Sequence, residues 1–294
     1  MADLVDAAIK TYRYLRIALI VLIVALAASV LLERAHATHL QESISAYYYT
    51  PAHSVLVATL VGLGACLIAL RGCNDTEDLL LNVAGMLAPM VALVPTTEPS
   101  DLYGSKALTI SNARVLIGNN VVALIIAGAV ALLVAWLVEQ SKRGKAVPNI
   151  RMVDAVGLAV ASALILVGGG TYWRARDFFL AHAHTASAIA MFAIVGLVVV
   201  LNSQRAGAEG KPRYQLYYAL AAGVMASGLL VVVVHLAVSG WKPWNFALES
   251  VEITGFAAFW IVQTFELWDV GVGAPVPVKE LVPGAAARRL RSGT

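Results

Sequence analysis

Eight blocks of uninterrupted apolar residues constrain this chain more than any other feature of its sequence. Each block holds roughly 17–25 residues, the length that an α-helix needs to cross ~30 Å of hydrocarbon. The blocks span residues 15–32, 53–70, 79–94, 115–138, 153–172, 178–201, 215–238 and 246–267. Apolar residues are continuous within each block and do not alternate with polar ones, which argues against a transmembrane β-barrel. We therefore predict an all-α fold, a polytopic transmembrane helical bundle of about eight spans.

Composition supports the same class of protein. Hydrophobic residues make up 60% of the chain and charged residues 13%, whereas a soluble domain is usually about half apolar and a quarter charged. The first apolar run is longer than the ~7–15 residues of a signal-peptide core, so we expect it to be a retained span. No basic stripe of the kind that binds nucleic acid is present, and no nucleic-acid partner is expected.

The distribution of Lys and Arg predicts the orientation in the membrane. If the N-terminus is inside, most of the 21 basic residues lie in cytoplasmic segments, as the positive-inside rule requires. We therefore expect both termini to be cytoplasmic and the protein to lie in the cytoplasmic (inner) membrane. Because no internal repeat is evident, we expect residues 1–270 to form a single bundle. Residues 271–294 are rich in proline and glycine and then basic, which predicts a flexible cytoplasmic tail.

Polar side chains concentrate on the opposite, extracytoplasmic side. All six histidines fall there, together with the segment "ESISAYYYTPAHSV" at residues 42–55 and the segment "NFALESVE" that begins the last span. Three consecutive tyrosines are compatible with an interfacial aromatic belt, but consecutive residues cannot all face lipid. We therefore expect a polar pocket on this side. Its candidate ligand-binding residues are Ser43, Ser45, Tyr47, Tyr48, Tyr49, His53, Arg114, His184, His235, Glu249 and Glu252.

Two glutamates and one histidine form the expected centre of that pocket. Glu249 and Glu252 are three residues apart and share one helical face. His184 and Glu252 each lie six residues into their spans, which places both about 9 Å below the outer helix ends. Because a carboxylate in a membrane needs a partner, we predict a contact between His184 and Glu252. Arg114, Arg174 and Arg176 are the alternative partners for Glu252, as a purely structural ion pair.

Metal binding is a further alternative for the histidines. His36 and His39 are spaced for joint ligation on one helical turn, although two solvated loop histidines would have the same spacing. The candidate metal ligands are His36, His39, His182, His184 and His235. The sequence contains no phosphate loop, CxxC pair, haem-attachment motif or nucleophile elbow, so the cofactor is unknown.

The sequence resembles a family of bacterial membrane proteins in several segments. "SISAYYYTPAHSVLV" and "TEDLLLNVAGMLAPMVALVPT" are similar to uncharacterised multipass proteins that carry an IS-x-YYYTP loop. The later "HAHTASAIAMF" and "ALESVEITGFAAFWIV" look like segments of the same family. This resemblance implies an architecture and a bacterial source, and no activity.

A second resemblance is to membrane-embedded metal hydrolases of the alkaline-ceramidase superfamily, which use a serine, an aspartate and three histidines around zinc. It would give these roles to Ser43 or Ser45, Asp177, His182 and His235. The spacing of the paired histidines and the number of spans depart from the pattern of that superfamily.

These observations lead to two expected functions. The first is a non-enzymatic binding protein for a lipid or a small solute, acting as an accessory, sensor or assembly protein. Its expected partners are the lipid bilayer and a second membrane protein. The alternative is a metal-assisted membrane-embedded hydrolase that acts on a lipid. An ion-coupled transporter is disfavoured because no charge lies convincingly at mid-span.

Overall fold

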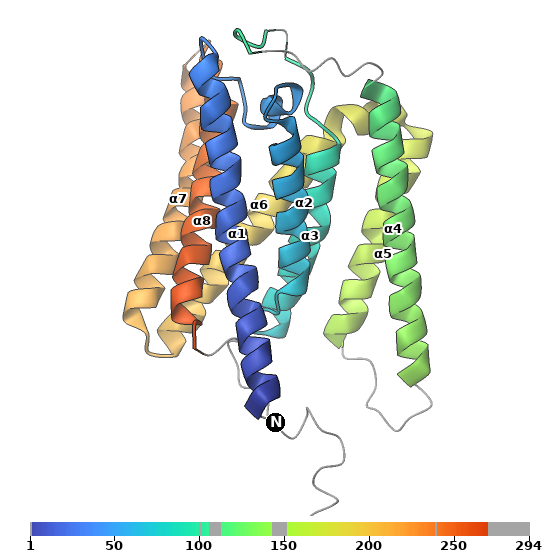
Figure 1. Cartoon of the computed structure of the whole chain (residues 1–294), viewed down its shortest axis with the longest axis vertical. Coiled ribbons are helices and arrows are strands. Elements are labelled where there is room, and N and C mark those ends of the chain that lie inside the picture. Colours follow the sequence, from blue (N-terminus) through green and yellow to red (C-terminus); the bar gives the residue numbers. More distant parts are fainter. Residues whose placement is uncertain (1, 100, 106–112, 143–151, 239, 270–294) are drawn as a thin grey trace, which may run out of the picture.

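The computed structural model describes residues 2–99, 101–105, 113–142, 152–238 and 240–269. Within these ranges the chain is all-α, with one short 3-10 helix, η1 (Figure 1). The elements are α1 (Ala2–His36), η1 (Ser45–Tyr49), α2 (His53–Ala69), α3 (Asp75–Leu93), α4 (Ala113–Lys142), α5 (Met152–Arg174), α6 (Arg176–Ala208), α7 (Pro212–Ala237) and α8 (Trp244–Glu266).

Seven of these helices are long and apolar enough to cross a membrane. The exception is α2, an apolar helix of 17 residues that extends ~26 Å at ~1.5 Å per residue. It lies between α1 and α3 (Figure 1). The prediction of an all-α multipass membrane protein is therefore confirmed. The first helix is longer than its apolar block, because polar residues continue it at both ends.

Six helices form a closed ring with a continuous apolar core. In the order α1, α2, α3, α6, α7, α8, each helix packs against the next, and α8 packs against α1. Leu19, Leu81, Val198, Tyr218 and Trp260 are fully buried where these helices meet. The element η1 lies inside one end of the ring, beside the start of α2 (Figure 1). We call this the η1 end, and the end where α1 begins the N-terminal end.

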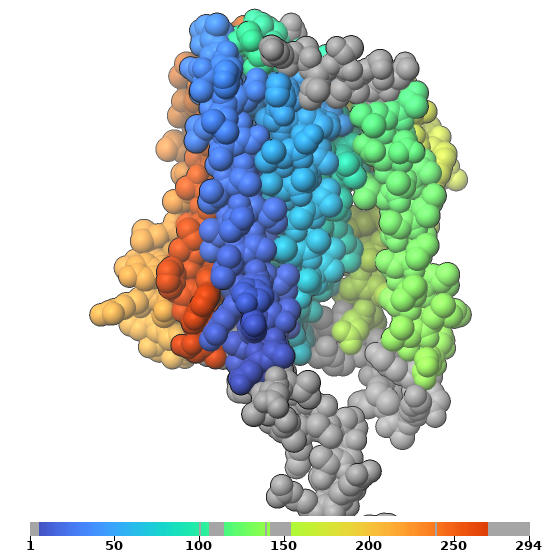
Figure 2. Space-filling model, in the orientation of Figure 1, coloured from blue at the N-terminus to red at the C-terminus, as the bar shows by residue number. Residues whose placement is uncertain are grey.

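The hairpin of α4 and α5 packs against the outside of this ring, beside α3 and α6. At the η1 end it is attached through a small apolar cluster of Val94, Val121, Tyr172 and Phe179. Elsewhere α4 stands at the edge of the molecule, as Figure 2 shows. Its apolar side chains are largely exposed, among them Ile126, Val130, Leu133 and Trp136. In a membrane protein this surface faces lipid.

Some predictions lie outside what the structure describes. The tail that we expected at residues 271–294 falls outside the described residues. Which end of the bundle faces the cytoplasm stays a prediction, as does the division of the chain into a single bundle and a tail.

Candidate functional site

Three polar side chains from distant parts of the sequence meet at the η1 end. The backbone N–H of Ser45 donates to Glu249 Oε2 at 2.9 Å, and Ser45 Oγ lies 3.0 Å from Glu249 Oε1. On its other side, Ser45 Oγ lies 3.1 Å from His184 Nε2. The serine comes from η1, the glutamate from α8 and the histidine from α6. We call Ser45, Glu249 and His184 the polar triad.

Local hydrogen bonds hold η1 in the position that forms the polar triad. The hydroxyl of Ser43 accepts from the backbone N–H of Ala46 at 2.9 Å, which stabilises the first turn of η1. The carbonyl of Glu42 accepts from the backbone N–H of Phe246 at 2.9 Å and ties the loop to the start of α8. The ring of Tyr47 packs against Phe246, with ring centroids 6.4 Å apart. Ser43, predicted as a ligand-binding residue, therefore supports η1 and is itself 6% exposed.

The orientation of His184 is fixed by α3. Its Nδ1 atom lies 2.8 Å from the carbonyl oxygen of Val94 and 3.1 Å from that of Val91. Since a carbonyl oxygen can only accept, Nδ1 carries a hydrogen and donates it. The other ring nitrogen, Nε2, then faces Ser45. The His184 side chain is 7% exposed, so its hydrogen bonds are buried inside the bundle.

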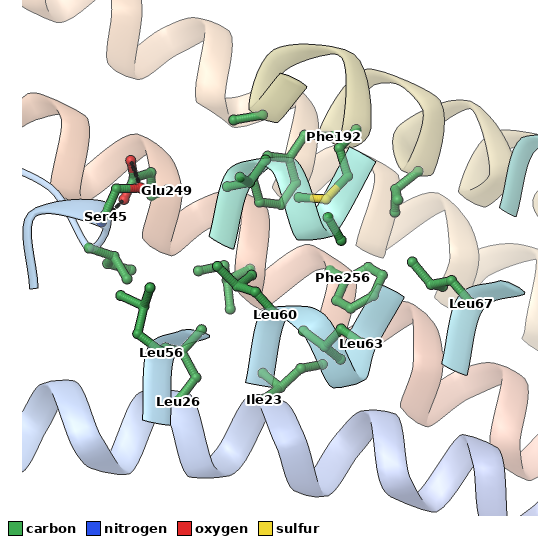
Figure 3. Close-up of a pocket in the computed structure, with 17 residues that line it drawn as sticks. Ile23, Leu26, Ser45, Leu56, Leu60, Leu63, Leu67, Phe192, Glu249 and Phe256 are labelled. Carbon is green, nitrogen blue, oxygen red and sulfur yellow. Dashed lines mark hydrogen bonds between the residues drawn. The ribbon is translucent and has the colours of Figure 1, made fainter. Parts of the chain in front are cut away.

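An apolar pocket extends from the polar triad into the core of the ring. Figure 3 shows Ser45 and Glu249 at one end of this pocket and Leu67 toward the other. Along α2 the lining runs from Leu56 to Leu67, a distance of ~16 Å at ~1.5 Å per residue. The other lining side chains are Ile23, Leu26, Ile44, Leu60, Leu63, Ala88, Val91, Ala188, Met191, Phe192, Val195, Ile253 and Phe256. The pocket is thus a long apolar space with carboxylate and hydroxyl groups at a single end.

The three consecutive tyrosines are all buried. Tyr47, Tyr48 and Tyr49 are 0%, 3% and 6% exposed, which goes beyond the expectation that they cannot all face lipid and argues against an aromatic belt. Tyr49 donates its hydroxyl to the carbonyl of Thr96 at 2.7 Å. Burial, with a smaller effect from Glu98, raises the pKa of Tyr49 to about 12, so this phenol stays protonated. The ring of His53 packs edge-on against Tyr48, with ring centroids 4.2 Å apart.

The predicted contact between His184 and Glu252 is wrong. Glu252 faces α7, where a Cβ added at Gly228 would lie 2.7 Å from its Oε1. Among the described residues its carboxylate has no hydrogen-bond or ion-pair partner. Glu249, one turn earlier on α8, is instead the carboxylate that reaches His184, through Ser45. The two helices α6 and α8 contact each other only weakly, so η1 has to bridge them.

The other candidate metal ligands contact residues outside the polar triad. His36 and His39 are exposed, and His39 packs against Tyr103. His182 is exposed and stacks on Phe178, while His235 stacks on Trp244 at 4.2 Å. Among the described residues, no three His, Cys, Asp or Glu side chains are placed to hold a metal ion. Metal-assisted chemistry at these histidines stays a prediction, because the described residues form no metal centre.

Two further residues of the sequence-based site lie at helix starts. Arg114 lies in the first turn of α4, but its side chain falls outside the described part of the structure. Asp177, which the ceramidase resemblance would use, lies in the first turn of α6. The serine of the triad contacts His184 and neither His182 nor His235, so the residue pattern of that resemblance is not reproduced.

A second polar cluster, which sequence reasoning did not identify, lies toward the N-terminal end. Glu77 on α3 is 1% exposed, and its Oε1 accepts from Asn202 on α6 at 2.9 Å and from Gln263 on α8 at 3.1 Å. Its Oε2 accepts from the backbone N–H of Cys73 at 2.9 Å. The side chain of Asn74 caps α3 by accepting from Glu77 N, and this Asn-x-x-Glu spacing was the available signal.

An ion-pair network adjoins this cluster. Arg205 lies 2.7 Å from Glu266 and 3.0 Å from Glu209, and Lys211 lies 3.1 Å from Glu266. Asp269 pairs with Arg13 of α1 at 3.1 Å, whereas Glu266 pairs with Arg205 at the end of α6 and with Lys211 just before α7.

Comparison with known proteins identifies no relative. No family model matches the chain, and no curated protein or solved structure is significantly similar to it. What the fold and site define is the class: an integral, multipass helical membrane protein with a buried polar cluster at Glu77, Asn202 and Gln263. The resemblance to bacterial proteins with an IS-x-YYYTP loop stays a prediction.

Proposed function

We propose that this protein binds the hydrocarbon chain of a single-chain amphiphile in the apolar pocket, with the polar head at the polar triad. The observation that carries the proposal is the shape and polarity of the pocket. Apolar side chains line it along ~16 Å of α2, and Ser45 and Glu249 close one end. Ligand sites in helical bundles commonly combine a mainly apolar wall with a few convergent polar groups.

The chemistry of the polar end favours a particular kind of head group. Glu249 and Ser45, which line the pocket, offer carboxylate oxygens and a hydroxyl, and His184 contacts the hydroxyl of Ser45. Among the residues that the structure describes, no Lys or Arg side chain lines the pocket. A phosphate or carboxylate head would therefore find no counter-charge, whereas an alcohol or amine could donate a hydrogen bond to Glu249. The expected ligand is a long-chain alcohol or amine.

A larger side chain that fills the pocket should weaken this binding. Ala188 lines the pocket from α6, and the next residue, Ile189, is 66% exposed on the outer surface. The probe is a diazirine-bearing long-chain alcohol, photolysed with the purified full-length protein, and labelled peptides are identified by mass spectrometry. We expect Ala188→Phe to reduce labelling of the pocket residues by at least roughly tenfold, a change that needs only ~1.4 kcal/mol of lost contact energy.

Ile189→Phe is the matched control, because it adds the same ring on the lipid-facing side of the same helix. It should label like the wild type. Equal labelling of the pocket in the two variants would mean that the probe reaches these peptides from lipid, and the proposal would be wrong.

A second candidate function, hydrolysis of a lipid, is favoured by one contact. The hydroxyl of Ser45 lies 3.1 Å from His184 Nε2, and His184 is oriented by the carbonyl of Val94, as a nucleophile and its base require. Against this, the N–H of Ser45 donates to Glu249 and that of Ala46 to Ser43, so neither could stabilise an oxyanion. Covalent labelling of Ser45 by an alkyl fluorophosphonate would establish the hydrolase; binding without labelling supports the non-enzymatic function.

The proposed setting is the cytoplasmic membrane, with the pocket's polar end facing outward. It is supported by the basic residues, which gather in the loops of the N-terminal end and in the tail. In a background lacking Cys66 and Cys73, we expect Thr97→Cys to react with an impermeant maleimide in intact cells. Ala208→Cys should react only after lysis.

Both positions are exposed in the structure and lie at opposite ends of the bundle. The reverse pattern would invert the orientation, and labelling of both in intact cells would contradict a membrane-spanning arrangement between them.

A further inference from the structure

The polar triad contains more hydrogen-bond acceptors than hydrogens. Ser45 has one hydroxyl hydrogen, and its Oγ lies between two groups that both accept when Glu249 is ionised and His184 is neutral. These are Glu249 Oε1 at 3.0 Å and His184 Nε2 at 3.1 Å. The hydrogen of His184 is already committed to the carbonyl of Val94 through Nδ1. In that charge state one of the two contacts would place lone pairs against each other.

One additional proton satisfies both contacts. If it resides on Glu249, the carboxyl donates to Ser45 Oγ, and Ser45 donates to His184 Nε2. If it resides on His184, the imidazolium donates to Ser45 Oγ, and Ser45 donates to Glu249. Either arrangement makes the triad neutral overall, which a site of low polarity favours over a lone carboxylate.

We propose that Glu249, Ser45 and His184 form a binding site for one proton, which passes between the glutamate and the histidine through the hydroxyl of Ser45. In the transfer, the Glu249 O–H bond breaks as a new bond forms to Ser45 Oγ. The original hydroxyl hydrogen of Ser45 moves to His184 Nε2. The products are a carboxylate, an intact serine and an imidazolium, so atoms and charge balance.

In the part of the chain that the structure describes, no ion pair at the triad competes with this proton. Among the described residues, neither Glu249 nor His184 takes part in an ion pair. The titratable groups on the adjoining elements include Glu42 before η1, Tyr47, Tyr48 and Tyr49 in η1, His53 at the start of α2, Glu252 one turn further along α8, and Arg176, Asp177 and His182 at the start of α6. Arg176 packs over the ring of Tyr172, 5.3 Å from its centroid. Glu252 faces α7.

The consequence for ligand binding rests on the proposed function. A ligand head that donates its own hydrogen bond to Glu249 replaces the donor that the proton supplies, so binding of a long-chain alcohol or amine would release the proton. The polar triad would then be a site at which a proton and an amphiphile compete.

The test needs no ligand, so its failure and the failure of the proposed function can be told apart. Infrared spectroscopy of the purified full-length protein at neutral pH reports protonated carboxyl groups, and NMR of the protein with ¹⁵N-labelled histidine reports imidazolium. We expect either a protonated-carboxyl band that Glu249→Gln removes, or an imidazolium signal that His184→Gln removes. Either result supports the shared proton.

Variants of the bridging serine sharpen the test. Ser45→Ala should shift the frequency of the carboxyl band or the chemical shift of the imidazolium, because the hydrogen-bond partner of the protonated group is lost. Ser45→Thr should retain the wild-type signal, and Ser54→Ala, at an exposed position in the first turn of α2, should leave it unchanged. Glu252→Gln identifies any band that belongs to the other glutamate of α8. A wild-type protein whose Glu249 is ionised while His184 is neutral would overturn the proposal, and so would a signal that persists unchanged in Ser45→Ala.

Discussion

Replacing Glu77 with leucine is expected to remove a large part of the folding stability of this protein. The carboxylate accepts hydrogen bonds from Asn202 and Gln263 and from the backbone of Cys73. Leucine would remove the shared acceptor of all three donors in a site where Glu77 itself is 1% exposed, and the backbone N–H of Cys73 would lose its acceptor there. It would also remove the negative charge near Arg16, a guanidinium that is 2% exposed. Breaking such a network typically costs ~3–5 kcal/mol, of a total stability of only ~5–15 kcal/mol.

The measurement is the unfolding free energy in detergent, or the midpoint of thermal unfolding followed by helical circular dichroism. Asp269→Ala is the control, because it removes a carboxylate whose side chain is 89% exposed and pairs with Arg13. An exposed pair contributes at most ~1 kcal/mol, so this variant should unfold nearly as the wild type does. Equal unfolding of the two variants would show that the cluster around Glu77 does not hold α3, α6 and α8 together.

The helices of this protein were predictable from sequence because their cause is local. A span needs a run of apolar residues of sufficient length, and each of the eight runs corresponds to one helix. The exact ends were less predictable, because polar residues can extend a helix beyond the apolar run. In α1 they do so by more than a turn at each end. Only α2, at 17 residues, falls below the length that defines the other candidate spans.

The site was predictable in its members but not in its contacts. Depth along a helix follows from residue number, and on that basis His184 and Glu252 were matched. Which side of α8 faces α6 depends on packing, and Glu252 points to Gly228 on α7 instead. The bridge through Ser45 depends on η1 entering the ring, which no periodicity in the sequence encodes. Burial of all three tyrosines follows from the same insertion.

The cluster around Glu77 escaped prediction for a related reason. Asn202 and Gln263 each look like isolated polar residues near the end of an apolar run, and isolated polar residues commonly make interhelical hydrogen bonds. Only the order of helices around the ring brings them to one carboxylate. The helix-capping spacing of Asn74 and Glu77 was local, but it indicates a helix start and gives no sign that α6 and α8 converge there.

Replacing Gly85 with valine is expected to separate α2 from α3 and to disrupt the pocket. A Cβ at position 85 would lie 2.7 Å from the carbonyl oxygen of Gly64 and 3.2 Å from the backbone nitrogen of Ile68. These are backbone atoms of α2, so they can give way only if the whole helix moves. Overpacking of this kind typically costs ~1–3 kcal/mol, and a branched side chain against backbone should reach the upper end of that range.

Gly223→Val on α7 is the matched control, because a Cβ there meets nothing within 4 Å. It replaces a helical glycine by the same residue, and should leave the unfolding free energy unchanged or raise it slightly, since glycine is unfavourable inside a helix. A Gly85→Val variant as stable as Gly223→Val would mean that the two helices do not approach as closely as the structure shows.

The same variant also tests whether the pocket depends on this crossing. Leu63 and Leu67 line the pocket from α2, one residue before and three residues after Gly64, and Ala88 and Val91 line it from α3. Helix displacement at the glycine contact must therefore move both walls. Photolabelling by the long-chain alcohol should fall in Gly85→Val even under conditions in which the variant remains folded, and persist in Gly223→Val. Retained pocket labelling in a folded Gly85→Val protein would place the binding space elsewhere than between these helices.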